Sequence, residues 1–556
     1  MQNKSEILFE KGIENFKKKN FIEAEKCFEE LKNDHPTNKD ILKNLSLCYF
    51  QNKKFKNCEN VIKLMFDLGL KEKKLIEFLL LVLKKQDDVN QILKLISEEK
   101  NNIDQKYELL EKFERPAITM DAEETENYRS SSIEKVNKAL VNNNLRLNVD
   151  SQFLDPPLFY YSYDKKDNLI FAKKLNELFR KTYYELSQKI EINKFKNEKI
   201  KIGFVSAYFK DHTISKLFKG LIFNLDKSIF DTNVFHLDNG NEIDDEFFEK
   251  EKENKIKILK LPKLFKEKVN FILNQNLDII FYPDIGMSTQ LYYLTFLRLG
   301  KKQITSWGHP ETTGNFNMDY FLSSKLLEIN FEEAQKHYSE QLLLSDYLPM
   351  YFFKPKVKKI EDSELLSSNS YSCPQTLFKL HPDFDEIIIK ILQNDSKAKI
   401  YFINDKEKCF SKKIYERLKK KIPNKIDKIH FLNKMTEEEF INHCGRTSVL
   451  LDPLYFGSGN SFHESMFYGT PTVSMPTKYL RSKIVEGAYK QMRVENPPIV
   501  KDLDNYVSLA IEIANTEPKQ NLERKKYYSE LANQNLYENK EALKSLEKIL
   551  IDVASK

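Results

Sequence analysis

The sequence predicts a helical N-terminal region followed by two doubly wound, Rossmann-like α/β domains. Three patterns support this prediction. A 34-residue repeat of apolar and small residues occupies 5–72, strands and helices alternate from about residue 199 onward, and a strand–glycine loop–helix–strand unit occupies 448–475. Alternating strands and helices are typical of parallel sheets whose faces are covered by helices.

Residues 5–38 and 39–72 match the tetratricopeptide pattern, a helix–turn–helix unit that repeats every 34 residues. The matching positions are Gly12, Ala24, Phe28 and Pro36 in the first copy and Leu45, Ser46, Tyr49, Cys58 and Ile62 in the second. A third, degenerate helical pair is expected over 73–110. The alternative is a generic helical bundle. Such repeats bury their apolar faces by stacking, and their common use is to bind an extended peptide or protein.

Composition limits the class of protein. Hydrophobic residues make up 41% and charged residues 31%, and the net charge is only +6, which describes a globular protein and gives no sign of a nucleic-acid partner. The six cysteines form no CxxC pair, so we expect reduced thiols. The N-terminus shows no apolar signal sequence, and Leu75–Leu83 is too short to span a bilayer. These features predict a cytoplasmic location.

Four domains are predicted from changes of pattern: helical repeats over 1–112, a helical connector over 113–195, one sheet domain over 196–345, and a second over 346–556 that includes the C-terminal helices. Within the connector, the acidic and Ser-rich stretch Asp121–Ser132 is expected to be a loop. Two tandem doubly wound domains with a cleft between them form the GT-B architecture of many nucleotide-sugar transferases. Ligands of such sheets bind at the carboxyl ends of the strands.

The unit at 448–475 is the most informative stretch. Only 14 residues of the chain are glycine, yet three of them fall between 457 and 469, where the backbone is expected to approach a ligand closely. Asn460 or Ser461 is expected to cap the following helix, with Glu464 closing a capping box. This arrangement is typical of phosphate sites, and the alternative is an ordinary tight turn.

Two residues are candidates for the chemistry. His212 follows the first strand of the first sheet, where an imidazole can exchange a proton near neutral pH, and the alternative is a capping or loop histidine. Lys379 lies where the second sheet domain begins, and an ammonium there can hold a diphosphate, although a solvated lysine is the more common case.

A shaped loop, SWGHPETTG, follows another predicted strand of the first sheet domain. It contains the single tryptophan of the chain, and the alternative to a site-lining loop is a turn with a packed tryptophan. The residues that we assign to an acceptor and sugar loop are Trp307, His309, Pro310, Thr312 and Thr313.

No metal is expected. The Asp-x-Asp triplets Asp383–Asp385 and Asp502–Asp504 open predicted helices, where acids are favoured by the helix dipole. No cluster of His, Cys and Asp has metal-ligand spacing, so phosphate charge would be met by lysine and backbone amides.

Four motifs, in the order in which they occur along the chain, resemble the protein O-GlcNAc transferase family, which joins tetratricopeptide repeats to a GT-B catalytic half. The motif sequences are most similar to those of the bacterial members. The motifs are DHTIS around His212, SWGHPETTG, CPQTLFKLHP, and GSGNSFHES with GTPTVSMP. The resemblance implies that His212 is the active-site histidine, as a base or a positioning residue. It also implies that Lys379 holds the diphosphate and stabilises its departure.

The same resemblance assigns the nucleotide-sugar contacts. Asn460 and Ser461 would meet the phosphates and Glu464 the ribose hydroxyls. Phe440 stands where animal members carry a histidine that stacks on uracil, and Glu437 lies near a position where they carry a lysine. The complete set of donor contacts implied is Thr376, which stands where the family usually has Gln, with Phe440, Gly459, Asn460, Ser461 and Glu464.

The implied function is inverting, metal-independent transfer of a sugar, GlcNAc or another hexose, from a UDP-sugar to Ser or Thr of a protein acceptor. One alternative is an asparagine-linked glucosyltransferase of the bacterial adhesin-modifying type, a group that usually lacks clear repeats. The other is a repeat-containing scaffold that binds a nucleotide sugar without catalysis. The sequence does not identify the sugar, the acceptor or the oligomeric state.

Overall fold

The computed structural model describes residues 4–237, 243–253, 255–328 and 330–556. The chain divides into two compact units. One contains the helical region up to Ala117 together with Asp405–Lys412, and the other contains the rest. The sequence-based limits of the four domains remain predictions.

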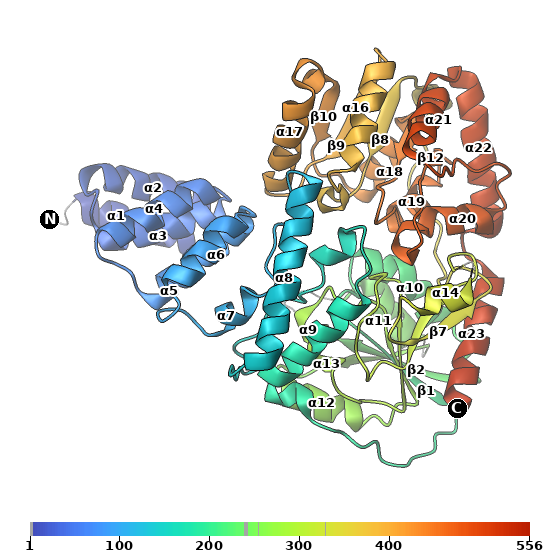
Figure 1. Cartoon of the computed structure of the whole chain (residues 1–556), viewed down its shortest axis with the longest axis horizontal. Helices are drawn as coiled ribbons and strands as arrows, with labels where there is room; N and C mark the ends of the chain where they lie inside the picture. The colour runs from blue at the N-terminus through green and yellow to red at the C-terminus, as the bar shows by residue number, and fades with distance from the viewer. Residues whose placement is uncertain (1–3, 238–242, 254, 329) are drawn as a thin grey trace. The chain divides into compact units, whose positions relative to one another are not determined.

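The helical unit is built of antiparallel pairs, drawn in blue in Figure 1. Its helices are α1 (Lys4–Lys17), α2 (Phe21–Asp34), α3 (Lys39–Gln51), α4 (Phe55–Asp67), α5 (Lys73–Lys85), α6 (Val89–Glu98) and α7 (Lys106–Leu110). The repeat residues occupy the contacts between helices: Gly12 faces the ring of Phe28, which a Cβ would approach to 2.8 Å. The residues predicted from the repeat pattern thus form the buried faces, except Pro36, which is exposed in the loop between α2 and α3. The third helical pair is present as α5 and α6.

The connector contains a helix that is longer than the sequence predicts, since a helix was expected only over Ser132–Ala139. α8 (Ala122–Asn142) covers most of the predicted loop at 121–132, because Asp121 accepts a hydrogen bond from the backbone N–H of Glu124 (2.7 Å) and caps the helix. η1 (Tyr160–Tyr163), α9 (Leu169–Thr182) and η2 (Tyr184–Ser187) follow.

The first sheet has seven parallel strands in the order β3-β2-β1-β4-β5-β6-β7. Their bounds are β1 (Ile200–Ser206), β2 (Phe230–His236), β3 (Lys257–Lys260), β4 (Ile279–Tyr282), β5 (Lys302–Ser306), β6 (Tyr320–Ser324) and β7 (Gln341–Ser345). The helices of this domain are α10 (Thr213–Asn224), α11 (Asp245–Lys252), α12 (Phe265–Leu273), α13 (Thr289–Leu294) and α14 (Phe331–Gln335). The strand order reverses between β1 and β4, so this is the switch point of the sheet.

The second sheet has five parallel strands in the order β10-β9-β8-β11-β12. Its strands are β8 (Ser370–Cys373), β9 (Lys399–Ile403), β10 (Ile429–Leu432), β11 (Val449–Leu451) and β12 (Thr472–Val473). The accompanying helices are α15 (Asp362–Leu365), η3 (Leu377–Lys379), α16 (Phe384–Asn394), α17 (Cys409–Lys421), η4 (Pro423–Lys428), α18 (Glu437–Arg446), α19 (Asn460–Ser465), η5 (Leu480–Ser482), α20 (Ile484–Met492) and α21 (Leu503–Asn515). Its switch point lies between β8 and β11.

The last two helices are α22 (Pro518–Asn535) and α23 (Lys540–Ser555). Although α23 was predicted to belong with the second sheet domain, it packs against β7 of the first (Figure 1). Its apolar stripe of Leu546, Leu550 and Val553 is buried in the core of that domain. The chain therefore crosses back to the first sheet, because an apolar stripe needs a buried partner surface.

Two further observations concern the described residues. No helix in them combines the length and apolar character needed to cross a bilayer. No disulfide links any of the six cysteines, all of which lie within the described ranges.

Candidate functional site

The candidate residues gather at the two switch points. In the second sheet domain, Gln375 and Lys379 follow β8, and the glycine loop at 457–459 follows β11. In the first, His212 follows β1, and 283–290 follows β4. Crevices at the carboxyl ends of such strand pairs are the usual ligand sites of doubly wound sheets.

Asp452 shapes the glycine loop. It is fully buried at the end of β11 and accepts hydrogen bonds from the Ser458 backbone N–H and the Ser474 hydroxyl, both at 2.6 Å. A Cβ on Gly457 would lie 2.9 Å from Asp452 Oδ2, so the turn requires glycine there. The Gly457 N–H donates to the Arg481 carbonyl at 2.8 Å. The loop is therefore fixed from both sides.

The predicted capping box is wrong. Gly459 is the N-cap of α19 without a side-chain cap, and Asn460 is the first helical residue. Glu464 is the fifth residue of the helix, beyond the third-residue position from which a capping box closes. The side chains of Asn460 and Glu464 are thus available for other contacts, and the Asn460 Oδ1 atom is buried with no hydrogen-bond partner among the described residues.

Lys379 lies directly against the glycine loop. Its Nζ donates to Gln375 Oε1 (3.0 Å) and to the Gly457 carbonyl (3.1 Å), and it stands 4.9 Å from the centre of the Phe456 ring. Burial lowers the pKa of Lys379 to about 8, against the opposing effect of Asp452. The ammonium is therefore largely charged at pH 7 and has no carboxylate bonded to it within the described residues.

Gln375, rather than Thr376, faces this site. Gln375 is buried, and its Nε2 donates to the hydroxyl of Ser461, while its Oε1 accepts from Lys379. Thr376 is exposed and starts the short helix η3. Successive side chains point in opposite directions in extended backbone, so a one-residue difference exchanges a site residue for a surface residue.

Glu464 points across to the first sheet domain. Its Oε1 pairs with Lys216 Nζ of α10 at 2.7 Å, and the same ammonium pairs with Glu437 Oε2 at 3.0 Å. Burial raises the pKa of Glu464, and Lys216 opposes this shift. A cavity of about 630 Å³ opens beside Lys216 and Glu437. Phe440, one turn along α18 from Thr436, packs partly buried against a small cluster around Ile441 and Tyr468.

His212 is the N-cap of α10. Its Nδ1 accepts a hydrogen bond from the Ile214 backbone N–H (3.2 Å), and its ring stacks on Tyr208 with 4.4 Å between the ring centres. Burial lowers the pKa of His212 to about 4, with Lys210 adding to the effect. The imidazole is thus neutral at pH 7. Because Nδ1 accepts, the ring proton sits on Nε2, so this nitrogen is arranged to donate a hydrogen bond.

Trp307 and His309 of the SWGHPETTG loop are buried and bonded internally. Trp307 Nε1 donates to the Pro349 carbonyl (3.3 Å). His309 Nε2 lies 3.1 Å from the Ser162 hydroxyl, and its ring stacks on Phe159. Burial lowers the pKa of His309 to about 4.

The two threonines of this loop, predicted to offer polar contacts to a ligand, are bonded to a buried carboxylate instead. Thr312 Oγ1 donates to Glu340 Oε2 (2.8 Å), and Thr313 bonds to Glu340 Oε1 through both its N–H (2.8 Å) and its hydroxyl. Pro310 is also buried. The loop therefore forms a rigid frame beside the site, and its polar side chains are bonded to residues that lie outside the loop.

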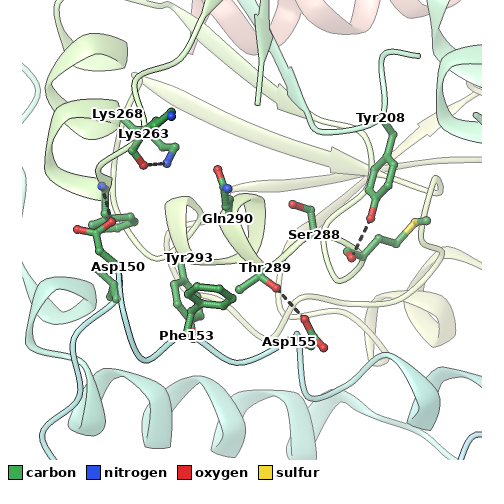
Figure 2. Close-up of a pocket in the computed structure, with 13 residues that line it drawn as sticks. Asp150, Phe153, Asp155, Tyr208, Lys263, Lys268, Ser288, Thr289, Gln290 and Tyr293 are labelled. Atoms are coloured by element: carbon green, nitrogen blue, oxygen red, sulfur yellow. Dashed lines mark hydrogen bonds between the residues drawn. The ribbon is translucent and has the colours of Figure 1, made fainter. Parts of the chain in front are cut away.

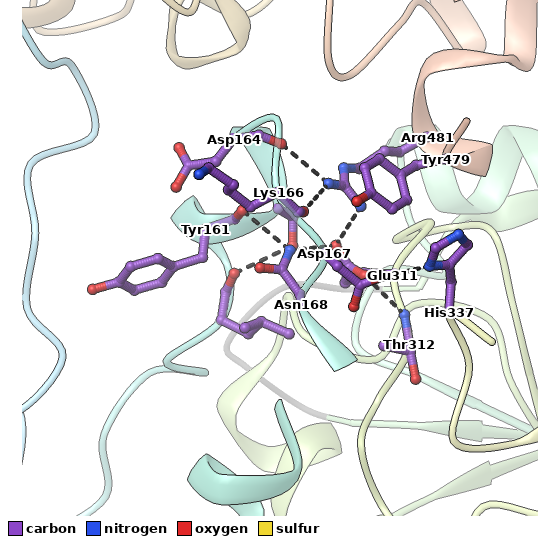
Figure 3. A network of polar contacts seen from close by, with 12 residues as sticks. Tyr161, Asp164, Lys166, Asp167, Asn168, Glu311, Thr312, His337, Tyr479 and Arg481 are labelled. Carbon is purple, nitrogen blue, oxygen red and sulfur yellow. Dashed lines mark hydrogen bonds and ion pairs between the residues drawn. The ribbon is translucent and has the colours of Figure 1, made fainter. Parts of the chain in front are cut away.

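Arg481 joins the two halves of the site and was not indicated by any sequence pattern (Figure 3). Its guanidinium pairs with Glu311 of the SWGHPETTG loop (3.0 Å) and donates to the carbonyls of Asp164 (3.1 Å) and Lys166 (2.6 Å). Asn168 also donates to Glu311 (2.7 Å). Burial raises the pKa of Glu311, which Arg481 opposes. Since the Arg481 carbonyl also receives the Gly457 N–H, one residue links the glycine loop to the acceptor-side loop.

In the described part of the chain, no group of three or more His, Cys, Asp or Glu side chains is placed to hold a metal ion. The predicted Asp-x-Asp triplets have structural partners: Asp385 pairs with Arg417 (2.8 Å) and Lys421 (2.9 Å), and Asp502 caps α21.

The tandem switch-point sheets and the returning C-terminal helix define the GT-B fold of nucleotide-sugar transferases. A mutant of the Thermobaculum terrenum O-GlcNAc transferase superimposes with a TM-score of 0.68 and 13% identity over 100% of this chain and 99% of that chain. This confirms the predicted resemblance at the level of the fold.

Sequence comparison gives a match over a shorter part of the chain. The chain is 24% identical over 278 residues to the UDP-glucose:protein N-beta-glucosyltransferases of two Actinobacillus pleuropneumoniae strains, serotype 5b and serotype 7. The match covers 48% of this chain and 43% of each relative, so it spans less than half of their length. No family model matches the chain.

Proposed function

We propose that the protein transfers a sugar from a UDP-sugar to a side chain of a protein acceptor, with inversion at the anomeric carbon. The observation that carries this proposal is the position of Lys379, a partly desolvated ammonium held by Gln375 and the Gly457 carbonyl at the switch point of the second sheet. The Ser461 hydroxyl is joined to the same group through Gln375.

The chemistry follows from charge. When the acceptor attacks the anomeric carbon, negative charge develops on the departing diphosphate. A fixed ammonium at low dielectric stabilises that charge more in the transition state than in the ground state. The lysine, the loop amides at 457–459 and the Asn460 side chain would bind the diphosphate. Glu464 would meet the ribose, which requires the Lys216 contact to open or to be shared.

His212 would act as a positioning group in this scheme. Its Nδ1 already accepts the Ile214 N–H, so Nε2 carries the proton and donates. A base would need the opposite tautomer and the loss of the capping bond. The geometry therefore supports a hydrogen bond from Nε2 to the donor or the acceptor in preference to proton removal by His212.

The acceptor atom defines two candidates. Transfer to Ser or Thr is the function implied by the sequence motifs and the repeat helices. Transfer of glucose to Asn is favoured by the match to the Actinobacillus pleuropneumoniae N-beta-glucosyltransferases. A protein acceptor is common to both, and the helical repeats are the proposed binding region for an acceptor or another protein partner. A non-catalytic scaffold is the third candidate.

The test is incubation of the full chain with a panel of labelled UDP-sugars and a bacterial lysate, followed by mass spectrometry of the modified peptides. Sugar on Ser or Thr supports the first candidate, and hexose on Asn supports the second. Nucleotide-sugar binding without hydrolysis or transfer would support the third candidate, the non-catalytic scaffold. Repeating the reaction with EDTA tests the proposed independence of metal, which predicts an unchanged rate.

A further inference from the structure

A cavity of about 370 Å³ lies at the switch point of the first sheet (Figure 2). Tyr208, whose ring stacks on His212, lines one side of it. Other walls come from Met287–Gln290, which follow β4, from Lys263–Lys268, which follow β3, and from the connector at 149–155. Its position between the ends of β1 and β4 is the position at which ligands bind in this class of sheet.

The ammonium of Lys268 lies in one wall of the cavity and forms no direct ion pair among the described residues. Lys268 lines the cavity although only 5% of its surface is exposed, and the hydrogen bond that its Nζ makes among the described residues goes to the backbone carbonyl of Lys263. Burial lowers the pKa of Lys268, against the opposing effects of Asp150 and Glu267. A buried ammonium with so few partners is costly, so an anion in the cavity would be stabilised.

The carboxylates at the rim are engaged elsewhere. Asp150 accepts the backbone N–H of Phe265 (2.8 Å), and Asp155 accepts the hydroxyl of Thr289 (3.0 Å). Lys263 is exposed and forms no ion pair within the described ranges. These bonds come from neutral groups and leave both carboxylates charged, so the lining holds two negative and two positive charges. The two ammoniums form no direct ion pair among the described residues, and theirs is the hydrogen-bonding capacity that remains open to a ligand.

Two further side chains that line the cavity, Gln290 and Phe153, offer contacts to a polypeptide. The amide oxygen of Gln290 is buried with no hydrogen-bond partner in the described part of the chain, and Figure 2 shows this side chain extending between the lysines and the rings of Phe153 and Tyr293. Such an oxygen accepts a peptide N–H. Phe153 exposes 50% of its surface beside it, which offers a face for an aliphatic stem.

We infer that this cavity binds an acidic side chain of the acceptor polypeptide, close in sequence to the residue that receives the sugar. The carboxylate meets Lys268 and Lys263, a neighbouring backbone N–H meets Gln290, and the stem lies on Phe153. Because Tyr208 separates the cavity from His212, the acidic residue selects and orients the acceptor without contacting the transferred sugar. This inference rests on the proposed protein acceptor.

The test uses short synthetic peptides with a central Ser or Asn in an Ala/Gly background. Each flanking position in turn carries Glu in one peptide and Gln in its partner. Binding to the full chain is measured by fluorescence anisotropy in the presence of UDP. We expect one flanking position at which Glu binds about tenfold more tightly than Gln, the effect of one charge-assisted hydrogen bond.

Two variants assign the effect. Lys268→Met keeps the length of the side chain and removes the charge, and it should abolish the Glu preference while the melting temperature is retained. Lys266→Met removes an exposed charge from the same helix and should keep the preference. Equal binding of Glu and Gln peptides at every position, or a preference that survives in Lys268→Met, overturns the inference.

Sugar transfer is measured on the same peptides. Transfer without any acidic preference would leave the proposed function standing and refute the cavity assignment. An acidic preference in binding, lost in Lys268→Met, with no transfer of any sugar would support the cavity and refute the proposed function.

Discussion

The glycine loop of the second sheet domain and the SWGHPETTG loop of the first, which we propose as the donor side and the acceptor side of the site, are built in different ways. At the second switch point, Lys379 bonds to the glycine loop, the Asn460 amide oxygen is buried without a hydrogen-bond partner among the described residues, and the buried carboxylate of Asp452 is bonded to the loop itself. In the SWGHPETTG loop, His309, Thr312 and Thr313 are bonded to Ser162 and Glu340. Residues that look equally functional in sequence thus form a binding surface in one case and a frame in the other.

The difference teaches that polarity in a motif says nothing about where its hydrogen bonds go. Buried carboxylates accept bonds from both loops, Asp452 in one and Glu340 in the other, but beside the glycine loop Lys379 is left without a carboxylate bonded to it among the described residues. Variants on the two sides should therefore fail in different ways: donor-side variants should lose activity with little loss of stability, and frame variants should lose stability first.

The largest effect is expected for Lys379→Ala. Removing the ammonium that faces the leaving diphosphate should lower kcat about a thousandfold, the size of effect seen when one electrostatic stabiliser is removed. Steady-state transfer assays measure it, with thermal unfolding as the control for the fold. Near-normal transfer in this variant would contradict the donor-side assignment.

Arg481→Met tests the frame. It leaves Glu311 buried without its cation, which should lower the free energy of unfolding by about 3 kcal/mol. Denaturant unfolding measures this loss. The matched control is Arg446→Met, since Arg446 pairs with Glu364 where both side chains are more than 40% exposed, and its loss should cost under ~1 kcal/mol. Equal losses in the two variants would show that the buried link is unimportant.

The pH dependence separates the two halves of the site. Lys379 loses its proton as pH rises through about 8, so transfer should fall about tenfold for each unit above that value. His212 has a pKa of about 4 and stays neutral from pH 5 upward. Its titration should therefore cause no fall in the transfer rate between pH 5 and pH 7. Rate profiles of wild type and Lys379→Arg provide the measurement. If the fall in transfer rate above pH 8 is the same in Lys379→Arg, it is caused by the titration of a group other than Lys379.

The smallest effect distinguishes adjacent residues. Gln375→Ala should raise the donor KM about fivefold, because it removes a bridge between Lys379 and Ser461. Thr376→Ala should leave KM and kcat unchanged, because that side chain is exposed. Donor titrations of the two variants suffice, and the reverse order would restore Thr376 as the phosphate contact.

The fold was predictable where buried residues follow a regular pattern along the sequence. Continuous apolar runs such as the stretch at 200–206 predict parallel strands, and the 34-residue period predicts the stacked helical pairs. The first half of α8 was missed because its turns are acidic and Ser-rich, whereas the part over Ser132–Ala139 was predicted to be helical. The capping bond from Asp121 marks the true start of this helix.

The site was predictable where function depends on a local motif. Lys379, His212 and the glycine loop were found because each follows a strand end, and strand ends converge in parallel sheets. Glu340, Arg481 and Lys216 were not found. Arg481 meets a carboxylate 170 positions away in the chain, and no local pattern specifies a partner at that separation. The structure caps α19 at Gly459 and not at Asn460 or Ser461, and it places Gln375, the neighbour of Thr376, against Lys379. Adjacent side chains in extended backbone point in opposite directions, so a sequence pattern alone does not decide between neighbours.

The pair between Lys216 and Glu464 has a consequence for how donor binding and domain movement are connected. Glu464 already holds a cation from the opposite domain, so a nucleotide that bonds to this carboxylate competes with an intramolecular ligand. The two effects are equal in free energy. A nucleotide that displaces Lys216 weakens the ion pair between the two sheet domains by the same amount by which that ion pair lowers the affinity for the nucleotide. In Lys216→Met, UDP should bind more tightly by calorimetry, and weaker binding would mean that Lys216 assists the nucleotide instead. If Glu464 is a nucleotide contact, as proposed, the intact pair competes with the nucleotide for this carboxylate.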